Sequence, residues 1–328
     1  MAVLVTGGAG YIGSHTVAEF MAQGEEVIVL DNLQKGHRDA VLAKTFYQGD
    51  IRDEKLLDRV FSNHDIEAVV HFAADSLVGE SVQIPLQYYD NNLITAQRLL
   101  VGMEKHGVKK IVFSSTAATY GEPKSIPILE TDPKEPTNPY GETKLAIENM
   151  LKWCGQAYGM SSVALRYFNA AGAHIEGHIG EDHRPESHLI PIILQVALGQ
   201  RKSLSIFGDD YPTPDGTCVR DYIHVTDLAM AHWLALEKLR KTQKSSVYNL
   251  GNGEGFSVLQ VVQKAREVTG HAIPIQRVPR RAGDPAVLIA SSEKALAELG
   301  WKPQFNRLEQ ILKTAWDWQR LHPHGFIK

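Results

Sequence analysis

The chain has 328 residues, of which 43% are hydrophobic and 22% are charged, which suits a globular protein with a sizeable core. Its 34 basic and 38 acidic residues give a net charge of −4, which disfavours a nucleic-acid-binding protein because such proteins usually present a basic face. We expect no signal peptide, no membrane span and, with only Cys154 and Cys218, no disulfide framework. These features predict a cytoplasmic protein without a membrane or nucleic-acid partner.

Short apolar strands alternate with amphipathic helices in the first half of the chain. Strands rich in Val and Ile are predicted at 3–6, 26–30, 68–72, 110–114 and 162–166. Helices are predicted at 11–23, 53–63, 85–106 and 143–158. This alternation is typical of a parallel sheet covered on both faces, and right-handed crossovers then give a doubly wound Rossmann-type α/β fold.

The sequence changes character after residue 172, where Gly, His and Pro become frequent. Later helices are predicted at 189–199, 225–239, 257–269, 292–299 and 308–321. We therefore predict a dinucleotide-binding Rossmann domain over residues 1–172 and a smaller α/β substrate-binding domain over residues 173–328. The boundary is open by several residues, and residues 222–250 are a candidate for a return to the first domain.

A glycine-rich turn, Gly7-Gly-Ala-Gly-Tyr-Ile-Gly13, joins the first predicted strand to the first helix. Gly7 permits a sharp turn, Gly10 lets the backbone approach a pyrophosphate, and Gly13 lets the helix pack on the sheet. The helix N-terminus offers free N–H groups to phosphates. Asp31 follows the second strand, eighteen residues after Gly13, where a carboxylate accepts ribose hydroxyls and repels a 2′-phosphate. The pattern predicts NAD rather than NADP as cofactor.

Tyr140 and Lys144 are four residues apart at the start of a predicted helix and therefore share one face. One cation about 4 Å from a phenol supplies on the order of 4 kcal/mol at an effective dielectric of 20, or roughly three pKa units. With an oxidised nicotinamide nearby, this predicts that Tyr140 acts as a base near pH 7. Thr116 follows the strand 110–114, where it can hydrogen-bond a substrate hydroxyl beside Tyr140.

Several motifs together resemble the UDP-glucose 4-epimerase family of extended short-chain dehydrogenases/reductases. They run from the first strand to about Trp301, and besides those above they include His71-Phe-Ala-Ala74, Tyr88-Tyr-Asp-Asn-Asn92, Arg166-Tyr-Phe-Asn169, Ile179-Gly-Glu-Asp182, Phe207-Gly-Asp-Asp-Tyr-Pro-Thr213, Val219-Arg-Asp-Tyr-Ile-His224 and Arg280-Arg-Ala-Gly-Asp284. The resemblance implies interconversion of UDP-galactose and UDP-glucose through a 4-keto sugar, with tightly bound NAD regenerated in each cycle. It also implies a homodimer that pairs helices 85–106 and 143–158.

The resemblance assigns roles to individual positions. Tyr140 is the implied base, Lys144 its electrostatic partner, and Thr116 the residue that orients the sugar O4. The positions implied for cofactor binding are Gly7, Gly10, Tyr11, Ile12, Gly13, Asp31, Asn32, Asp50, Ile51, Phe72, Ala73, Ala74, Asn91, Ser114, Tyr140, Lys144 and Phe168. The positions implied for substrate binding are Thr116, Tyr140, Asn169, Leu189, Phe207, Arg220, Arg281, Asp284 and Leu288.

The chain departs from the family pattern at two positions. Ser76 stands where relatives often have Lys near the cofactor, so we expect measurable NAD exchange. Leu288 stands where relatives have either a bulky aromatic or a small residue, so we expect at least weak turnover of UDP-N-acetylglucosamine.

Two other functional readings compete with epimerisation. One is a different NAD-dependent sugar-nucleotide enzyme, a 4,6-dehydratase or a decarboxylase. Related dehydratases have Asp-Glu where this chain has Ala117-Ala118, and an apolar pair cannot do acid–base work. The other is a non-catalytic NAD-sensing module, which the fold alone allows but which has no need of Tyr140 and Lys144.

Four histidines, at 174, 178, 183 and 188, raise the question of a metal site. Residues i and i+4 share a face only in a helix, and Gly172, Gly177, Gly180 and Pro185 disfavour one here. The sequence therefore predicts loop histidines near the substrate and no metal.

Overall fold

The computed structural model describes residues 1–281 and 285–326. A seven-stranded sheet in the order β10-β6-β5-β4-β1-β2-β3 forms its centre, with every neighbouring pair parallel. The strands are β1 (Ala2–Thr6), β2 (Glu26–Asp31), β3 (Thr45–Gln48), β4 (Ile66–His71), β5 (Lys110–Ser114), β6 (Ser161–Tyr167) and β10 (Ser246–Leu250). All five predicted strands and the Rossmann-type fold are confirmed, whereas β3, a short half-exposed edge strand, was not predicted.

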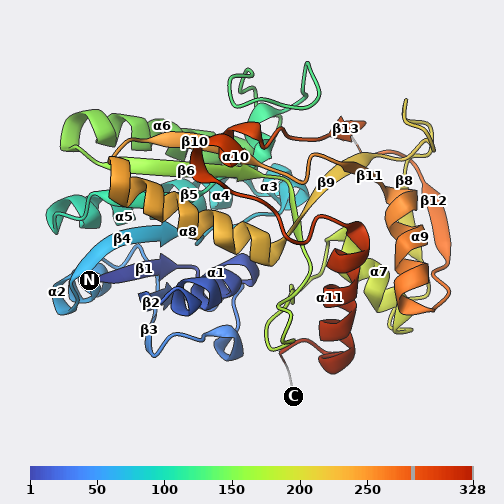
Figure 1. The fold of residues 1–328 in the computed structure, drawn as a ribbon, viewed down its shortest axis with the longest axis horizontal. Coiled ribbons are helices and arrows are strands. Elements are labelled where there is room, and N and C mark those ends of the chain that lie inside the picture. The colour runs from blue at the N-terminus through green and yellow to red at the C-terminus, as the bar shows by residue number, and fades with distance from the viewer. Residues whose placement is uncertain (282–284, 327–328) are drawn as a thin grey trace.

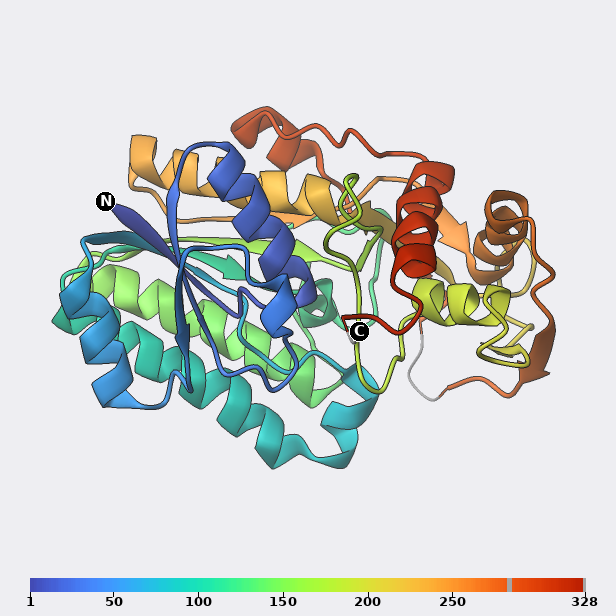
Figure 2. The same cartoon turned by 90° about the horizontal axis from the view of Figure 1, so that it is seen from below.

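Helices cover both faces of this sheet, as Figure 2 shows. One face carries α2 (Glu54–Asn63), α5 (Thr95–Lys105) and α6 (Pro139–Tyr158). The other carries α1 (Tyr11–Ala22), α8 (Val225–Thr242) and α10 (Glu293–Leu299). The apolar strands are buried from both sides, which explains why they read as continuous Val- and Ile-rich runs.

The helix predicted at 85–106 is not uniform. It consists of α4 (Pro85–Tyr88), a π-helical segment (Tyr89–Ile94) and α5, and α3 (Val78–Gln83) precedes it. Within the π-helical segment Asn92 is fully buried, and its side chain donates to the Asp75 carbonyl and the Thr143 hydroxyl at 3.0 and 3.1 Å. Such π-helical turns often occur at functional sites.

The second half of the chain packs beside the carboxyl ends of the seven strands (Figure 1). It contains α7 (Leu189–Ala197), α9 (Val258–Thr269) and α11 (Leu308–Leu321), which share one apolar core. Two small sheets complete it, built from β7 (Asn169–Ala171), β9 (Val219–His224), β11 (Gly255–Ser257) and β13 (Val287–Leu288), and from β8 (Leu204–Phe207) with β12 (Ile275–Val278). The five helices predicted in this half are confirmed.

Segments from late in the sequence also join the first sheet. Helix α8 packs against α1, and β10 pairs with β6 as the edge strand. The boundary at residue 172 stays a prediction. No helix in the described part of the chain is both long enough and apolar enough to cross a membrane.

Candidate active site

The strand order reverses between β1 and β4, and both neighbouring connections open at the carboxyl ends of these strands. In open α/β sheets this switch point is where ligands bind. Gly7 lies here with φ +76°, and a Cβ on it would be 2.6 Å from the Ala73 nitrogen. A Cβ on Gly13 would be 2.1 Å from the Gly7 carbonyl oxygen. Both contacts are too short for any side chain, so the glycines hold α1 directly against the switch point.

The first turn of α1 suits a dinucleotide. Gly10 is the N-cap, and no side chain caps this end of the helix, so its first N–H groups are available to phosphate oxygens. Asp31 lies nearby at the end of β2, and its carboxylate accepts from the Ala9 and Leu33 amides at 3.0 and 2.8 Å. Burial raises the pKa of Asp31, while these two amides oppose the rise. The amides orient the carboxylate and leave lone pairs for ribose hydroxyls.

The other positions predicted to hold the cofactor follow the same strand edge. Ile51 is buried, and the neighbouring Asp50 is oriented by Arg52, whose guanidinium lies 2.7 Å away and lowers the pKa of that carboxyl. Phe72, Ala73 and Ala74 directly follow β4. Asn91 lies on the π-helical segment and donates to the Asp75 carboxylate at 2.7 Å. Asn32 is exposed after β2.

Tyr140 and Lys144 lie in the first turns of α6, on one face. Asn138 caps this helix by accepting from the Gly141 amide, and Pro139 is its first residue. Lys144 is buried, and its Nζ donates to the Ser114 carbonyl at 2.9 Å and lies 5.9 Å from the centre of the Tyr140 ring. The helix therefore brings the predicted base and cation to the end of β5, beside Thr116, which is also buried.

Burial, more than charge, governs the two pKa values. Burial raises the pKa of Tyr140 to about 12, and the Thr116 hydroxyl opposes this rise. Burial lowers the pKa of Lys144 to about 7, and the Glu148 carboxylate opposes this fall. The outcome differs from the estimate based on spacing, because that estimate counted the attraction of one cation and neglected the desolvation of both groups.

A buried network behind Lys144 was not predicted. Arg166 lies 2.5 Å from the Glu148 carboxylate and donates to the Tyr120 hydroxyl at 2.7 Å. Tyr120 in turn donates to the Asn249 side chain on β10, at 2.7 Å. The one signal in the sequence is that Glu148 follows Lys144 by four residues on the same helix. The network ties α6 to β6 and β10 and so fixes the position of Lys144.

The positions predicted to face the sugar lie around a short 3-10 helix, η3 (Ala117–Tyr120), whose N-cap is Thr116. Phe168 and Leu288 both pack against the apolar cluster of Ala117, Tyr120 and Ile128. The structure thus brings Leu288, from late in the sequence, to the side of the predicted catalytic strand end. Asn169 donates to the Asp221 carbonyl at 3.0 Å, which fixes its side chain at the start of β7.

The remaining predicted substrate positions form a second group. The Arg281 guanidinium carbon lies 3.8 Å from the centre of the Phe207 ring. Arg220 pairs with Leu288 in the β9–β13 register, and its guanidinium donates to the Val219 carbonyl. Leu189 is the first residue of α7. Asp284 lies outside the described residues.

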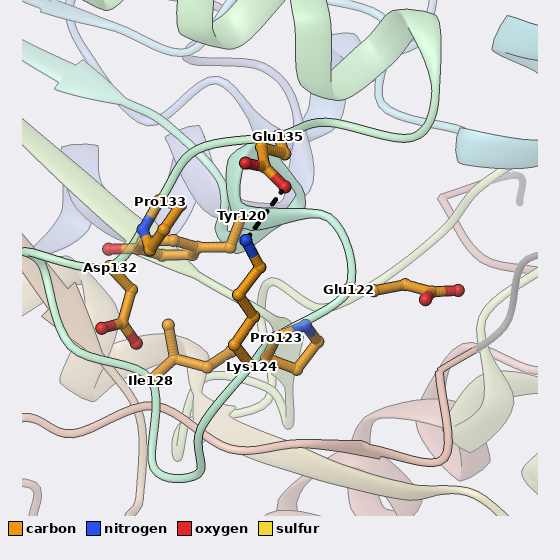
Figure 3. Close-up of a pocket in the computed structure, with 8 residues that line it drawn as sticks. All are labelled: Tyr120, Glu122, Pro123, Lys124, Ile128, Asp132, Pro133 and Glu135. Carbon is orange, nitrogen blue, oxygen red and sulfur yellow. Dashed lines mark ion pairs between the residues drawn. The ribbon is translucent and has the colours of Figure 1, made fainter.

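A small pocket lies beside η3, at the loop that follows it. Figure 3 shows Lys124 and Glu135 across it, 3.6 Å apart, and both side chains are exposed. The pocket shares Tyr120 and Ile128 with the apolar cluster beside Thr116, but none of the predicted site residues lines it.

The chain is similar to known proteins over nearly its whole length. A family model described as "NAD dependent epimerase/dehydratase family" matches residues 3–251. The UDP-glucose 4-epimerase of Halalkalibacterium halodurans is 65% identical over 99% of this chain and 98% of its own length. A crystal structure of a UDP-glucose 4-epimerase matches with a TM-score of 0.98 and 56% identity, covering all of both chains. The Bifidobacterium longum UDP-glucose 4-epimerase, solved with NAD+ and UDP, matches with a TM-score of 0.94 and 44% identity over 99% of this chain and 100% of its own.

Proposed function

This chain belongs to the NAD dependent epimerase/dehydratase family, and on that basis we propose that it is an NAD-dependent UDP-glucose 4-epimerase. It interconverts UDP-galactose and UDP-glucose by inverting C4 of the hexose. The observation that carries the proposal is that Tyr140, Lys144 and Thr116 meet at the end of β5. They lie in the same fold as a glycine turn at which no side chain fits.

When bound, NAD would supply a hydride acceptor for C4 that is regenerated within each cycle. The residues suited to hold it are the glycines of the loop, the first turn of α1 and the Asp31 carboxylate. Because the pKa of Tyr140 is raised to about 12 by burial, the phenol needs a further positive charge beside Lys144 before it can act as a base near neutral pH. The oxidised nicotinamide of bound NAD would supply that charge.

Within this arrangement each side chain has one task. Tyr140 takes the proton from the sugar O4 as C4 is oxidised, and Thr116 holds the O4 hydroxyl in line with the phenol. Lys144 keeps its place through the Ser114 carbonyl and favours the phenolate once formed. Once the 4-keto sugar has turned about its bond to UDP and presents its other face, Tyr140 would return the proton to O4, and the bound cofactor would supply the hydride that completes the inversion at C4.

The substrate-binding positions suit the UDP part. Arg220 and Arg281 are permanently charged, forked donors of the kind that bind diphosphates, and Phe207 offers a ring face beside Arg281. Asn169 and Leu189 complete this side, and Leu288 borders the sugar. The alternative readings lack support of this kind. A dehydratase needs acid–base side chains where Ala117 and Ala118 stand, and a sensing module needs no Tyr140.

The decisive experiment is turnover of UDP-galactose with and without added NAD. Formation of UDP-glucose without net NADH is expected. Accumulation of a 4-keto-6-deoxy sugar would replace the proposal with a dehydratase, and no reaction on UDP-hexoses would leave the sensing module. The same assay tests the role of Ser76, which is exposed near the cofactor loop. If the missing cation lets NAD exchange, dialysed enzyme will regain activity on adding NAD.

A homodimer and a cytoplasmic location are also part of this proposal. Large apolar side chains are exposed along α4, α5 and α6, among them Leu86, Val101 and Trp153, which are 82%, 53% and 64% exposed. A surface of this kind is typical of an oligomer interface. Sedimentation analysis of the wild type and Trp153→Lys should give a dimer and a weakened dimer. The two cysteines are free thiols, as a reducing compartment requires.

A further inference from the structure

We propose that the loop between β7 and α7, residues 172–188, binds one divalent transition-metal ion of the Zn²⁺ type through Glu181, His183, Glu186 and His188. The sequence argued against a metal site because no helix was expected to bring the histidines together. The four side chains converge although they lie in a loop. Two imidazoles and two carboxylates are a ligand set that Zn²⁺ accepts, and this set leaves no coordination position open.

The distances between the ligand atoms fit a single ion. Glu181 Oε1 lies 3.2 Å from His183 Nδ1 and 2.7 Å from His188 Nδ1. The Glu186 carboxylate lies 3.7 Å from His183 Nδ1 and 3.4 Å from His188 Nδ1. A tetrahedral ion with bonds of about 2.1 Å would separate its ligands by roughly 3.4 Å. The four distances scatter around that value.

Without an ion, protons on the two imidazoles must balance the charge of the two carboxylates. Nδ1 of both His183 and His188 is buried and faces the Glu181 and Glu186 carboxylates, with which it forms ion pairs when the imidazole is protonated. The Glu181 and Glu186 side chains are only 8% and 4% exposed. An ion in their midst would satisfy both nitrogens and both carboxylates together.

Contacts from outside the cluster hold the loop in place. The Tyr11 hydroxyl donates to the Gly172 carbonyl at 2.6 Å, and Asp182 accepts from the Phe326 amide at 3.0 Å. Gly180 lies flat on α11, because a Cβ there would be 2.2 Å from the Trp318 ring. The surrounding fold and the ion pairs within the cluster together set the ligand positions, as a preorganised metal site requires.

The position of the cluster indicates a structural role. The His183 ring lies 6.2 Å from the ring of Tyr11 in the glycine loop, and His188 immediately precedes Leu189, the first residue of α7. An ion bound here would fasten the start of α7 to the cofactor-binding loop. Closed sites with four protein ligands are typically structural rather than catalytic.

A second histidine group in the same loop provides a matched control. His174, Glu176 and His178 also lie close together, but Glu176 is 74% exposed and the His174 Nδ1 accepts from the Glu176 amide at 3.3 Å. The groups that would face an ion there are solvated or already bonded. We therefore expect tight binding at the first cluster alone.

The test uses the full-length protein without a histidine tag. Metal content is measured by plasma mass spectrometry before and after loading with Zn²⁺, and Co²⁺ is used as a spectroscopic probe. We expect one ion per chain, the strong visible absorption of four-coordinate Co²⁺, and a higher melting temperature with Zn²⁺. Glu181→Gln and His183→Asn should each abolish stoichiometric binding, whereas the double variant Glu176→Gln/His178→Asn should bind like the wild type.

Two outcomes would overturn the proposal: no saturable binding of Zn²⁺ or Co²⁺ by the wild type, or equal binding by the cluster variants and the wild type. Circular dichroism of each variant before loading separates loss of the site from loss of the fold. If Glu181→Gln unfolds, His183→Asn decides the question. None of these readouts depends on epimerase activity, so the outcome is independent of the function proposed above.

Discussion

The carboxyl end of the seven-stranded sheet and the loop over residues 172–188 both hold titratable side chains, but the two regions position these side chains differently. At the carboxyl end of the sheet, Tyr140 lies at the start of a helix and Asp31 at the end of a strand, and local hydrogen bonds hold both regions in place. In the loop, Glu181 and His183 lie in no helix or strand, and contacts with α1 and α11 hold the chain. Function at the carboxyl end of the sheet should therefore respond to the loss of single functional groups. Function in the loop should respond to changes in packing.

The largest effect should come from Tyr140→Phe at the carboxyl end of the sheet. Removing the hydroxyl removes the base, so turnover of UDP-galactose should fall by about 10²–10⁴-fold. Binding of UDP and the metal content of the loop should not change, since the ring remains. A loss of less than tenfold would mean that another group takes the proton.

Glu148→Gln tests how much the buried network behind Lys144 stabilises the carboxyl end of the sheet. The change leaves Arg166 buried without a countercharge and should cost about 3–5 kcal/mol of unfolding free energy. The control is Glu267→Gln, whose partner Lys264 is exposed, and which should change the unfolding free energy far less, because solvent screens this pair. Urea denaturation measures both, and equal losses would contradict the prediction.

Gly13→Ala and Gly180→Ala compare the two regions directly. Each added methyl would meet other atoms at 2.1 or 2.2 Å, so each should cost about 1–3 kcal/mol of stability. Gly13→Ala should also weaken NAD binding, and Gly180→Ala should instead weaken metal binding. Gly79→Ala, where a methyl meets nothing within 4 Å, is the control. Titration of NAD and of Zn²⁺ would show whether the two effects separate.

Lys144 should give the NAD-free protein a characteristic pH dependence. Its pKa in the folded chain is lowered to about 7 from 10.5, so between these values the unfolded chain binds more protons. The contribution of Lys144 to stability should therefore rise as pH increases from 7, by at most about 1.4 kcal/mol per pH unit. Lys144→Met should remove this slope, whereas Lys152→Met, an exposed lysine of the same helix, should keep it. Unfolding free energies across this pH range are the measurement.

The smallest effect is expected at Leu288, beside Phe168 and Ala117. Leu288→Tyr should narrow the sugar side and lower turnover of UDP-N-acetylglucosamine roughly tenfold more than turnover of UDP-galactose. Comparing kcat/KM for the two substrates gives the ratio. An unchanged ratio would mean that Leu288 does not contact the sugar.

The sequence by itself determined the regular part of this protein. Strand and helix periodicity identified five strands of the central sheet and most helices, and the glycine spacing identified the turn at which α1 meets the sheet. Tyr140 and Lys144 were placed on one face of α6 for the same reason, because residues four apart on a helix share a face. These inferences succeed since each depends on a few neighbouring residues.

Only the tertiary structure decided the rest. It gave β10 its place beside β6, put a π-helical segment into a predicted α-helix, and joined Glu148 to Arg166. It also set the pKa of Tyr140 by burial and gathered Glu181, His183, Glu186 and His188 around one point. Desolvation and the convergence of loop side chains depend on which distant segments pack together, and no local pattern of residues carries that information.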